Sequence, residues 1–165
     1  MIKSLRLLLL ASLLLAGQAM ADHPMLMARI NMKADLAIEY LKTAIEEHGY
    51  AVAHTQKCDT GMADFGLHSD FYRVVFFGKL DEIRRISAKH PEFVSYLPLK
   101  IVVEAEKSEA VMVAVNPLTF NRYYANDPDM LVQFQRWRND ILSILNDVHK
   151  AAGGAVALHR DGAAK

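Results

Sequence analysis

Residues Phe71–Pro117 read FYRVVFFGKLDEIRRISAKHPEFVSYLPLKIVVEAEKSEAVMVAVNP, and no other part of the chain says as much about its architecture. The first seven residues, Phe71–Phe77, are aromatic or β-branched apart from one arginine and predict a strand. Apolar residues then recur at helical spacing over 80–86, and Pro91 closes this short helix because proline cannot continue it.

The rest of this stretch predicts a β-hairpin. Leu99–Ala105 and Ala110–Val115 are two apolar runs of strand length, and the polar turn Glu106–Glu109 separates them. Asn116-Pro117 ends the second strand, because proline has no N–H to donate to the ladder.

The residues before this stretch predict a strand, a helix and a second strand. Met25–Met32 is a short apolar run, and Asp35–His48 carries apolar residues on one helical face. Gly49 is expected at the C′ position that closes this helix. Tyr50–Thr55 predicts the second strand, and Gln56–Asp70 lacks a clear period and predicts a loop of about 15 residues.

A long helix is predicted after a connector over Leu118–Asn126. Asp127 suits the N-cap and Pro128 the first helical position. An apolar stripe follows at Met130, Phe134, Trp137, Ile141, Leu145 and Val148. Gly153-Gly154 is expected to end this helix, and residues 152–165 are expected to form a disordered tail.

The predicted order is therefore β-α-β-β-α-β-β-α. Hairpins and helices mix in this order, so the fold class is α+β, with a mixed or antiparallel sheet and helices packed on it. The length of 165 residues favours a single domain. We expect it over residues 22–151.

Several short motifs occur together in a fixed order. His90-Pro91-Glu92 follows the short helix, Leu97-Pro98 precedes an Ile-Val-Val strand, and Asn116-Pro117 ends the hairpin. With the Gly-Tyr-Ala-Val sequence at 49–52, this order over residues 33–117 resembles the domain of unknown function 302 family.

The resemblance implies a small α+β domain that tends to dimerise, and it implies no activity. We therefore expect a homodimer. Many members of that family carry a cysteine after the Leu-Pro step, where this chain has Leu99. A role for that cysteine is not carried over.

The composition excludes several classes of protein. The 19 basic and 19 acidic side chains balance, so no excess of positive charge is present to hold a nucleic acid backbone. A single cysteine, Cys58, excludes a disulfide within the chain and a cysteine-rich metal framework.

The N-terminal residues predict a secretory signal peptide over 1–21. Lys3 and Arg6 precede an apolar run over 7–16, and Ala19-Met20-Ala21 is a small-x-small cleavage site. Cleavage after Ala21 predicts a periplasmic or secreted protein with no membrane span. The alternative is an uncleaved N-terminal anchor.

The predicted loop and its flanks hold four soft or borderline donors, namely His54, Cys58, Met62 and His68. Imidazole, thiolate and thioether together suit copper or haem iron. In the competing interpretation, Cys58 and Met62 pack against the sheet and both histidines face solvent. A weaker second cluster is His23, Met25 and Met27 at the expected new N-terminus.

The remaining motifs fit structural roles better than chemical ones. Lys57 beside Cys58 favours a thiolate, so a redox or sulfur-handling role is the alternative function. Arg84, Arg85 and Lys89 predict a solvated helix face or an anion site. We therefore predict an exported, non-catalytic binding or accessory domain of unknown ligand.

Overall fold

The computed structural model describes residues 23–59, 65–66 and 71–162, and residues 154–162 are described by their backbone alone. Five strands form one sheet in the order β1-β5-β4-β3-β2, and every neighbouring pair is antiparallel. The strands are β1 (Met25–Ile30), β2 (Ala51–Lys57), β3 (Tyr72–Gly78), β4 (Leu99–Glu106) and β5 (Glu109–Val115). The predicted sheet is thus confirmed, and of the two alternatives it is the antiparallel one.

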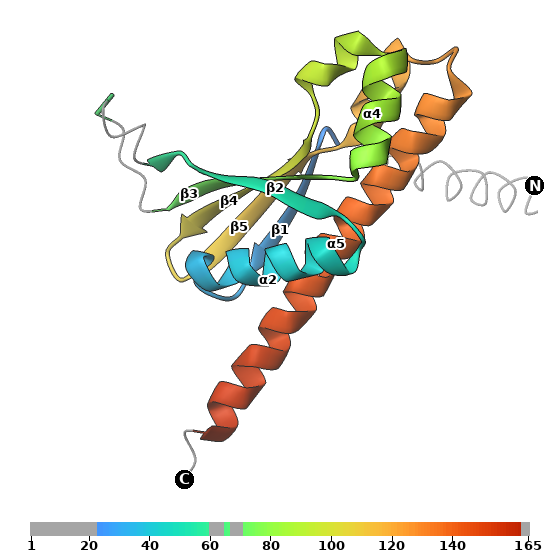
Figure 1. Cartoon of the computed structure of the whole chain (residues 1–165). Coiled ribbons are helices and arrows are strands. Elements are labelled where there is room, and N and C mark those ends of the chain that lie inside the picture. Colours follow the sequence, from blue (N-terminus) through green and yellow to red (C-terminus); the bar gives the residue numbers. More distant parts are fainter. Residues whose placement is uncertain (1–22, 60–64, 67–70, 163–165) are drawn as a thin grey trace, which may run out of the picture.

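Two long helices lie on the same side of the sheet, as Figure 1 shows. They are α2 (Ala34–Glu47) and α5 (Pro128–Gly162). A third helix, α4 (Leu80–Lys89), lies beside the first half of α5, and two 3-10 helices, η1 (Pro91–Ser95) and η2 (Pro117–Tyr123), connect the remaining elements. The predicted α+β class is therefore confirmed.

The core lies between the sheet and these helices. Alternate residues of each strand point into it, because successive side chains of a strand face opposite sides. Ile101 and Val103 of β4 and Met112 of β5 are fully buried in this way. The predicted stripe of α5 is confirmed as buried at Met130, Phe134, Trp137, Ile141, Leu145 and Val148.

Helix α2 ends in the way that Gly49 predicts. Gly49 has a φ of 73°, a conformation that favours glycine. Its N–H donates to the carbonyl of Glu46, and the N–H of Tyr50 donates to that of Ile45. This pair of hydrogen bonds is a Schellman motif, and it turns the chain from α2 directly into β2.

The start of α5 also follows the sequence. The backbone N–H of Met130 donates to the Asp127 carboxylate over 3.2 Å, so Asp127 caps the helix as predicted.

Two predicted strand ends are wrong by two residues. Strand β1 ends at Ile30, two residues early, because the N–H of Met32 turns back to the carbonyl of Ile30. Strand β2 continues to Lys57, because its pairing with β3 continues to the Lys57–Arg73 pair, so the predicted loop begins later. The segment 118–126 does connect β5 to α5, and it contains most of η2, which the sequence did not predict.

The end of α5 is also corrected. The helix continues through Gly153-Gly154 to Gly162, where the sequence predicted a disordered tail. Glycine costs about 1 kcal/mol relative to alanine within a helix. Four alanines at 151, 152, 155 and 157 lie around this pair and favour the helix.

Among the described residues, no helix combines the length and the hydropathy that crossing a lipid bilayer requires.

Candidate functional site

The described helices leave the second face of the sheet uncovered. Figure 1 shows α2 and α5 on one side of the sheet and no described element over the opposite side. The side chains of Val74, Val102 and Val113 project from this face and are only partly buried. We call it the open face.

Strand register places apolar side chains in a row across the open face. Met27 pairs with Val113, Val113 with Val102, and Val102 with Val74. The row therefore crosses four neighbouring strands. Met27, at its outer end on β1, is 60% exposed. A single exposed apolar side chain is common, so the contiguity of the row is the informative feature.

Two of the predicted soft ligands lie at the edge of this face. His54 lies in β2, where its ring stacks on Phe76 with 6.4 Å between the centroids. Cys58 follows the end of β2, is half-buried and carries a free thiol. Its N–H donates to the carbonyl of Tyr72 over 3.0 Å, which extends the pairing with β3 by one residue.

The structure does not bring these two side chains together. Four residues along a strand span roughly 13 Å, whereas two ligands of one metal ion lie a few ångströms apart. Met62 and His68, the other two predicted donors, lie outside the described residues. Among the residues that the structure does describe, no group of three His, Cys, Asp or Glu side chains could hold a metal ion.

The second group of soft donors lies at the start of β1. The backbone carbonyl of His23 accepts a hydrogen bond from the Asn116 side chain, which fixes the chain at the start of β1. Met25 and Met27 are exposed on the open face. The contacts of this segment are therefore those of the first residues of an edge strand.

The basic residues of α4 contact carboxylates or amides individually. Arg85 donates to Gln133 over 2.8 Å, and Arg84 lies 3.9 Å from Asp81. Lys89 lies 3.0 Å from the Asp127 carboxylate. The three side chains therefore do not converge on one point.

A partly buried polar cluster joins α4 to α5. Glu82, in the first turn of α4, lies 2.7 Å from the Arg136 guanidinium and accepts a hydrogen bond from Trp137 over 3.1 Å. Arg136 also lies 3.6 Å from Asp140, which accepts a hydrogen bond from the buried Tyr50 hydroxyl over 2.5 Å. These five residues connect α4, α5 and the start of β2.

The pKa values in this cluster follow from its contacts. Burial alone would raise the pKa of the Glu82 carboxyl, but the hydrogen bonds from Arg136 and Trp137 outweigh it and hold this pKa below its ordinary value. Burial raises the pKa of the Tyr50 phenol far above its usual range, and the hydrogen bond to Asp140 raises it further. Glu82 is therefore ionised and Tyr50 neutral at physiological pH.

The comparisons with known proteins agree with this architecture. The family model for DUF302, a domain of unknown function, matches residues 26–148, which is most of the chain. This chain belongs to the DUF302 family.

A solved structure of another DUF302 protein has the same fold. It is an uncharacterised conserved protein from Bacillus stearothermophilus, 16% identical to this chain, and the two superpose with a TM-score of 0.67. The match covers 76% of this chain and 98% of the other. No curated protein matches this chain.

Leu99 occupies a structural position in this DUF302 domain. It opens β4 directly after the Leu97-Pro98 step and is 2% exposed. Its side chain belongs to the core, so a leucine here adds apolar packing and no chemical group.

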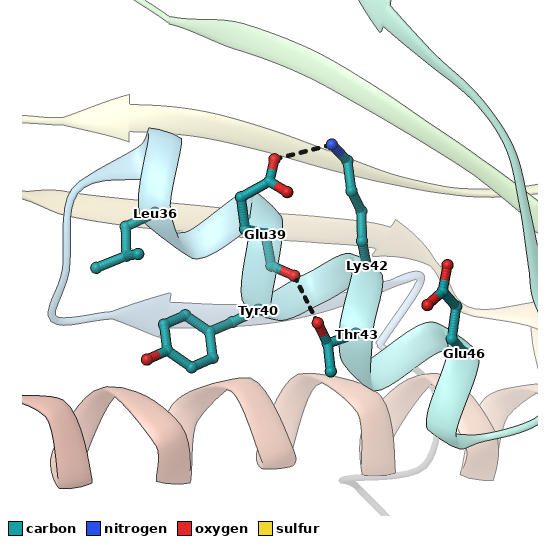
Figure 2. A pocket seen from close by; sticks show the side chains of 6 residues that line it. All are labelled: Leu36, Glu39, Tyr40, Lys42, Thr43 and Glu46. Atoms are coloured by element: carbon teal, nitrogen blue, oxygen red, sulfur yellow. Dashed lines mark hydrogen bonds and ion pairs between the residues drawn. The ribbon is translucent and has the colours of Figure 1, made fainter.

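A shallow groove runs along α2 on the helical side of the DUF302 domain. Figure 2 shows Tyr40 and Thr43 of α2 facing α5, with Leu36 and Glu46 at the two ends. The groove has a volume of about 430 Å³. Thr43 donates to the carbonyl of Glu39 within α2, so this hydroxyl already has an acceptor.

Neither the open face nor the α4–α5 cluster was predicted from the sequence. The two strands of the hairpin looked like continuous apolar runs, and only the positions of α2 and α5 decide which alternate residues are covered. From the sequence alone, Glu82 fits a solvated charge at a helix end. One local signal existed, because Arg136 and Asp140 are four residues apart on one helix face.

Proposed function

We propose that this DUF302 chain is an exported, non-catalytic accessory domain that acts as a homodimer, with a second copy covering its open face. The observation that carries this proposal is the apolar row Met27, Val113, Val102 and Val74. Large apolar patches on a soluble domain mark interaction surfaces, because exposed apolar area is removed from water when a partner covers it.

The area of the open face supports a second copy as its occupant. Five strands about 4.8 Å apart and about seven residues long give a flat face of roughly 500 Å². Side-chain relief increases the accessible area above this footprint. A stable interface buries about 800 Å² of accessible surface on each partner, which is the same order.

Export is supported by the N-terminal sequence. Two basic residues, an apolar run and an Ala-Met-Ala site occur in the order that signal peptides require. Removing residues 1–21 leaves two more acidic than basic side chains, and the new chain begins at Asp22.

A non-catalytic role is supported by the structural use of the displaced ionisable groups. Tyr50 and Glu82 have the hydrogen-bond partners described above, and these contacts hold α4 and β2 against α5. Strongly displaced pKa values often mark catalytic groups, but structural networks produce them as well. The groups of this cluster make their contacts within the chain, so a structural network explains their displaced pKa values better than catalysis does.

The experiment combines intact mass with oligomeric state. The chain is expressed with its N-terminal residues, collected from the exported fraction and weighed, and we expect a mass that begins at Asp22. Sedimentation equilibrium of this material should give a dimer. A cytoplasmic, full-length chain would contradict export, and a monomer at tens of micromolar would contradict the homodimer.

A matched pair of variants locates the interface. Val102→Asp places a charge at the centre of the open face and should yield a monomer. Val132→Asp introduces the same charge on α5, where the valine is 69% exposed, and should leave the dimer intact. A mass increase at Cys58 from a mixed disulfide or persulfide would instead favour the redox alternative.

A further inference from the structure

The central strand of the sheet carries two opposite charges at equal distances from one valine. Lys100, Val102 and Glu104 all project from the open face of β4, because their neighbours Leu99, Ile101 and Val103 point into the core. Lys100 lies two residues before Val102, and Glu104 lies two residues after it. Strand β4 is the third of five, so this trio lies at the middle of the sheet.

In the described part of the chain, neither charge lies beside a side chain of the opposite sign. Among the residues that the structure describes, Lys100 and Glu104 form no ion pair with another side chain. The ammonium of Lys100 instead lies 5.9 Å from the centre of the Phe76 ring and 5.7 Å from that of Tyr96. Glu104 is exposed and pairs across the sheet with Tyr72 and Val111.

We propose that the two copies in the dimer are related by a two-fold axis that runs along the apolar row, so that Lys100 of each chain lies opposite the partner's Glu104. This inference rests on the proposed function and specifies the geometry of its interface. Such an axis places Val102 against the partner's Val102. The axis exchanges the two sides of the apolar row. One ion pair between Lys100 and the partner's Glu104 therefore lies on each side of the row, or equivalently between Glu104 and the partner's Lys100, and the two pairs are identical by symmetry.

The charges select this axis over the other simple one. A two-fold axis parallel to the strands would place Lys100 opposite the partner's Lys100 and Glu104 opposite the partner's Glu104. Like charges that face each other across an interface are unfavourable, and opposite charges fix the register of an interface. The pattern of Lys100 and Glu104 is therefore self-complementary in one orientation only.

The dimensions of packed sheets permit these contacts. Two sheets pack about 10 Å apart, and lysine and glutamate side chains extend far enough from both sides to meet across that distance. Packed sheets are rotated by about 30° relative to each other, so their edges diverge while their centres stay opposed. The two charged residues lie on the central strand, where this divergence is smallest.

The test uses the mature full-length chain and three charge variants. The dimer dissociation constant is measured by sedimentation equilibrium for Lys100→Glu, Glu104→Lys and the double variant that carries both. Each single variant places like charges opposite each other at two symmetric positions, and we expect it to weaken the dimer about tenfold or more. The double variant restores opposite charges and should return to within about threefold of the wild type. Lys42→Glu on α2, on the covered side of the sheet, is the control and should leave the constant unchanged.

The outcomes separate this inference from the proposed function. A wild-type dimer that neither single variant weakens, or single variants that the double variant does not rescue, would overturn the proposed axis and leave the homodimer standing. A monomeric wild type would overturn the homodimer itself, including the case in which a different protein occupies the open face. Circular dichroism of each variant checks that the fold is intact, so that a change in the dissociation constant reports on the interface.

Discussion

The indole N–H of Trp137 donates a hydrogen bond to the carboxylate of Glu82 over 3.1 Å, and this contact joins α5 to the first turn of α4. The two residues are 55 positions apart in the sequence. The Trp137 ring is 1% exposed and stacks on Phe93 of η1, with 6.1 Å between the centroids. A single side chain thus contacts two elements that lie at one end of the sheet.

Replacing Trp137 tests how much of the stability depends on this contact. Trp137→Ala should lower the free energy of unfolding by roughly 3–5 kcal/mol, because it leaves a large cavity in the core. Trp137→Phe keeps most of the apolar contact but loses the N–H donor, and should cost about 1–2 kcal/mol. Urea denaturation followed by circular dichroism measures both values, and equal losses would show that the ring contributes little by packing.

The dependence of stability on pH in the acid range tests the contacts of the Glu82 carboxylate with Arg136 and Trp137. Its pKa in the folded protein lies below the ordinary value of 4.5, so the unfolded chain binds this proton first as the pH falls. The contribution of Glu82 to stability is therefore present above pH 4.5 and is lost as the pH falls through the lower folded value. The free energy of unfolding should decrease more steeply in this range for the wild type than for Glu82→Gln.

The control for this measurement is an exposed carboxylate of α2. Glu47→Gln should leave the wild-type slope almost unchanged, because no described contact of Glu47 would be lost. Identical slopes for the wild type and Glu82→Gln would show that Arg136 and Trp137 do not stabilise the ionised carboxylate.

The parts of the fold that the sequence predicts correctly rest on local signals. The Gly49 turn, the Asp127 cap and the buried stripe of α5 each depend on residues within a few positions of one another. The length of α5 was underestimated, because a glycine pair is a weak local stop signal that neighbouring alanines offset.

The candidate surfaces depend on contacts between distant residues. Tyr50 and Asp140 are 90 positions apart, and neither has a neighbour in the sequence that indicates the other. The open face could not be predicted, because the sequence does not show which side of the sheet the helices cover. His54 and Cys58 are close in sequence and were predicted to share a site, but an extended strand separates side chains that a compact loop could have brought together.

Alkaline titration tests the environment of the tyrosines. Burial raises the pKa of Tyr96 to about 12, and burial together with the Glu92 hydrogen bond raises that of Tyr124 to about 12. The folded protein therefore keeps these phenols neutral where an unfolded chain, with a pKa of 10.0, has lost their protons. Their contribution to stability is present below pH 10 and is lost as the pH rises towards 12.

Phenolate absorbance after a rapid pH jump measures this effect. At pH 11, fewer of the six tyrosines should be ionised in the native protein than after addition of urea. Tyr96→Phe should reduce the difference between the two conditions by about one tyrosine. A native protein whose tyrosines all titrate near pH 10 would contradict the raised pKa values of Tyr96 and Tyr124.

A copper titration tests whether His54 and Cys58 act as one site. They are separated by roughly 13 Å along an extended strand, so within one chain they cannot bind the same ion. The Cu(I) affinity is measured for His54→Gln, Cys58→Ser and the double variant, all in the Val102→Asp background, in which we expect each chain to be a monomer. The effects of the two single changes should then add to within about 0.5 kcal/mol, as is usual for residues that share no partner. A coupling energy above about 1 kcal/mol would show that both side chains reach one metal ion, and that the end of β2 rearranges when the metal binds.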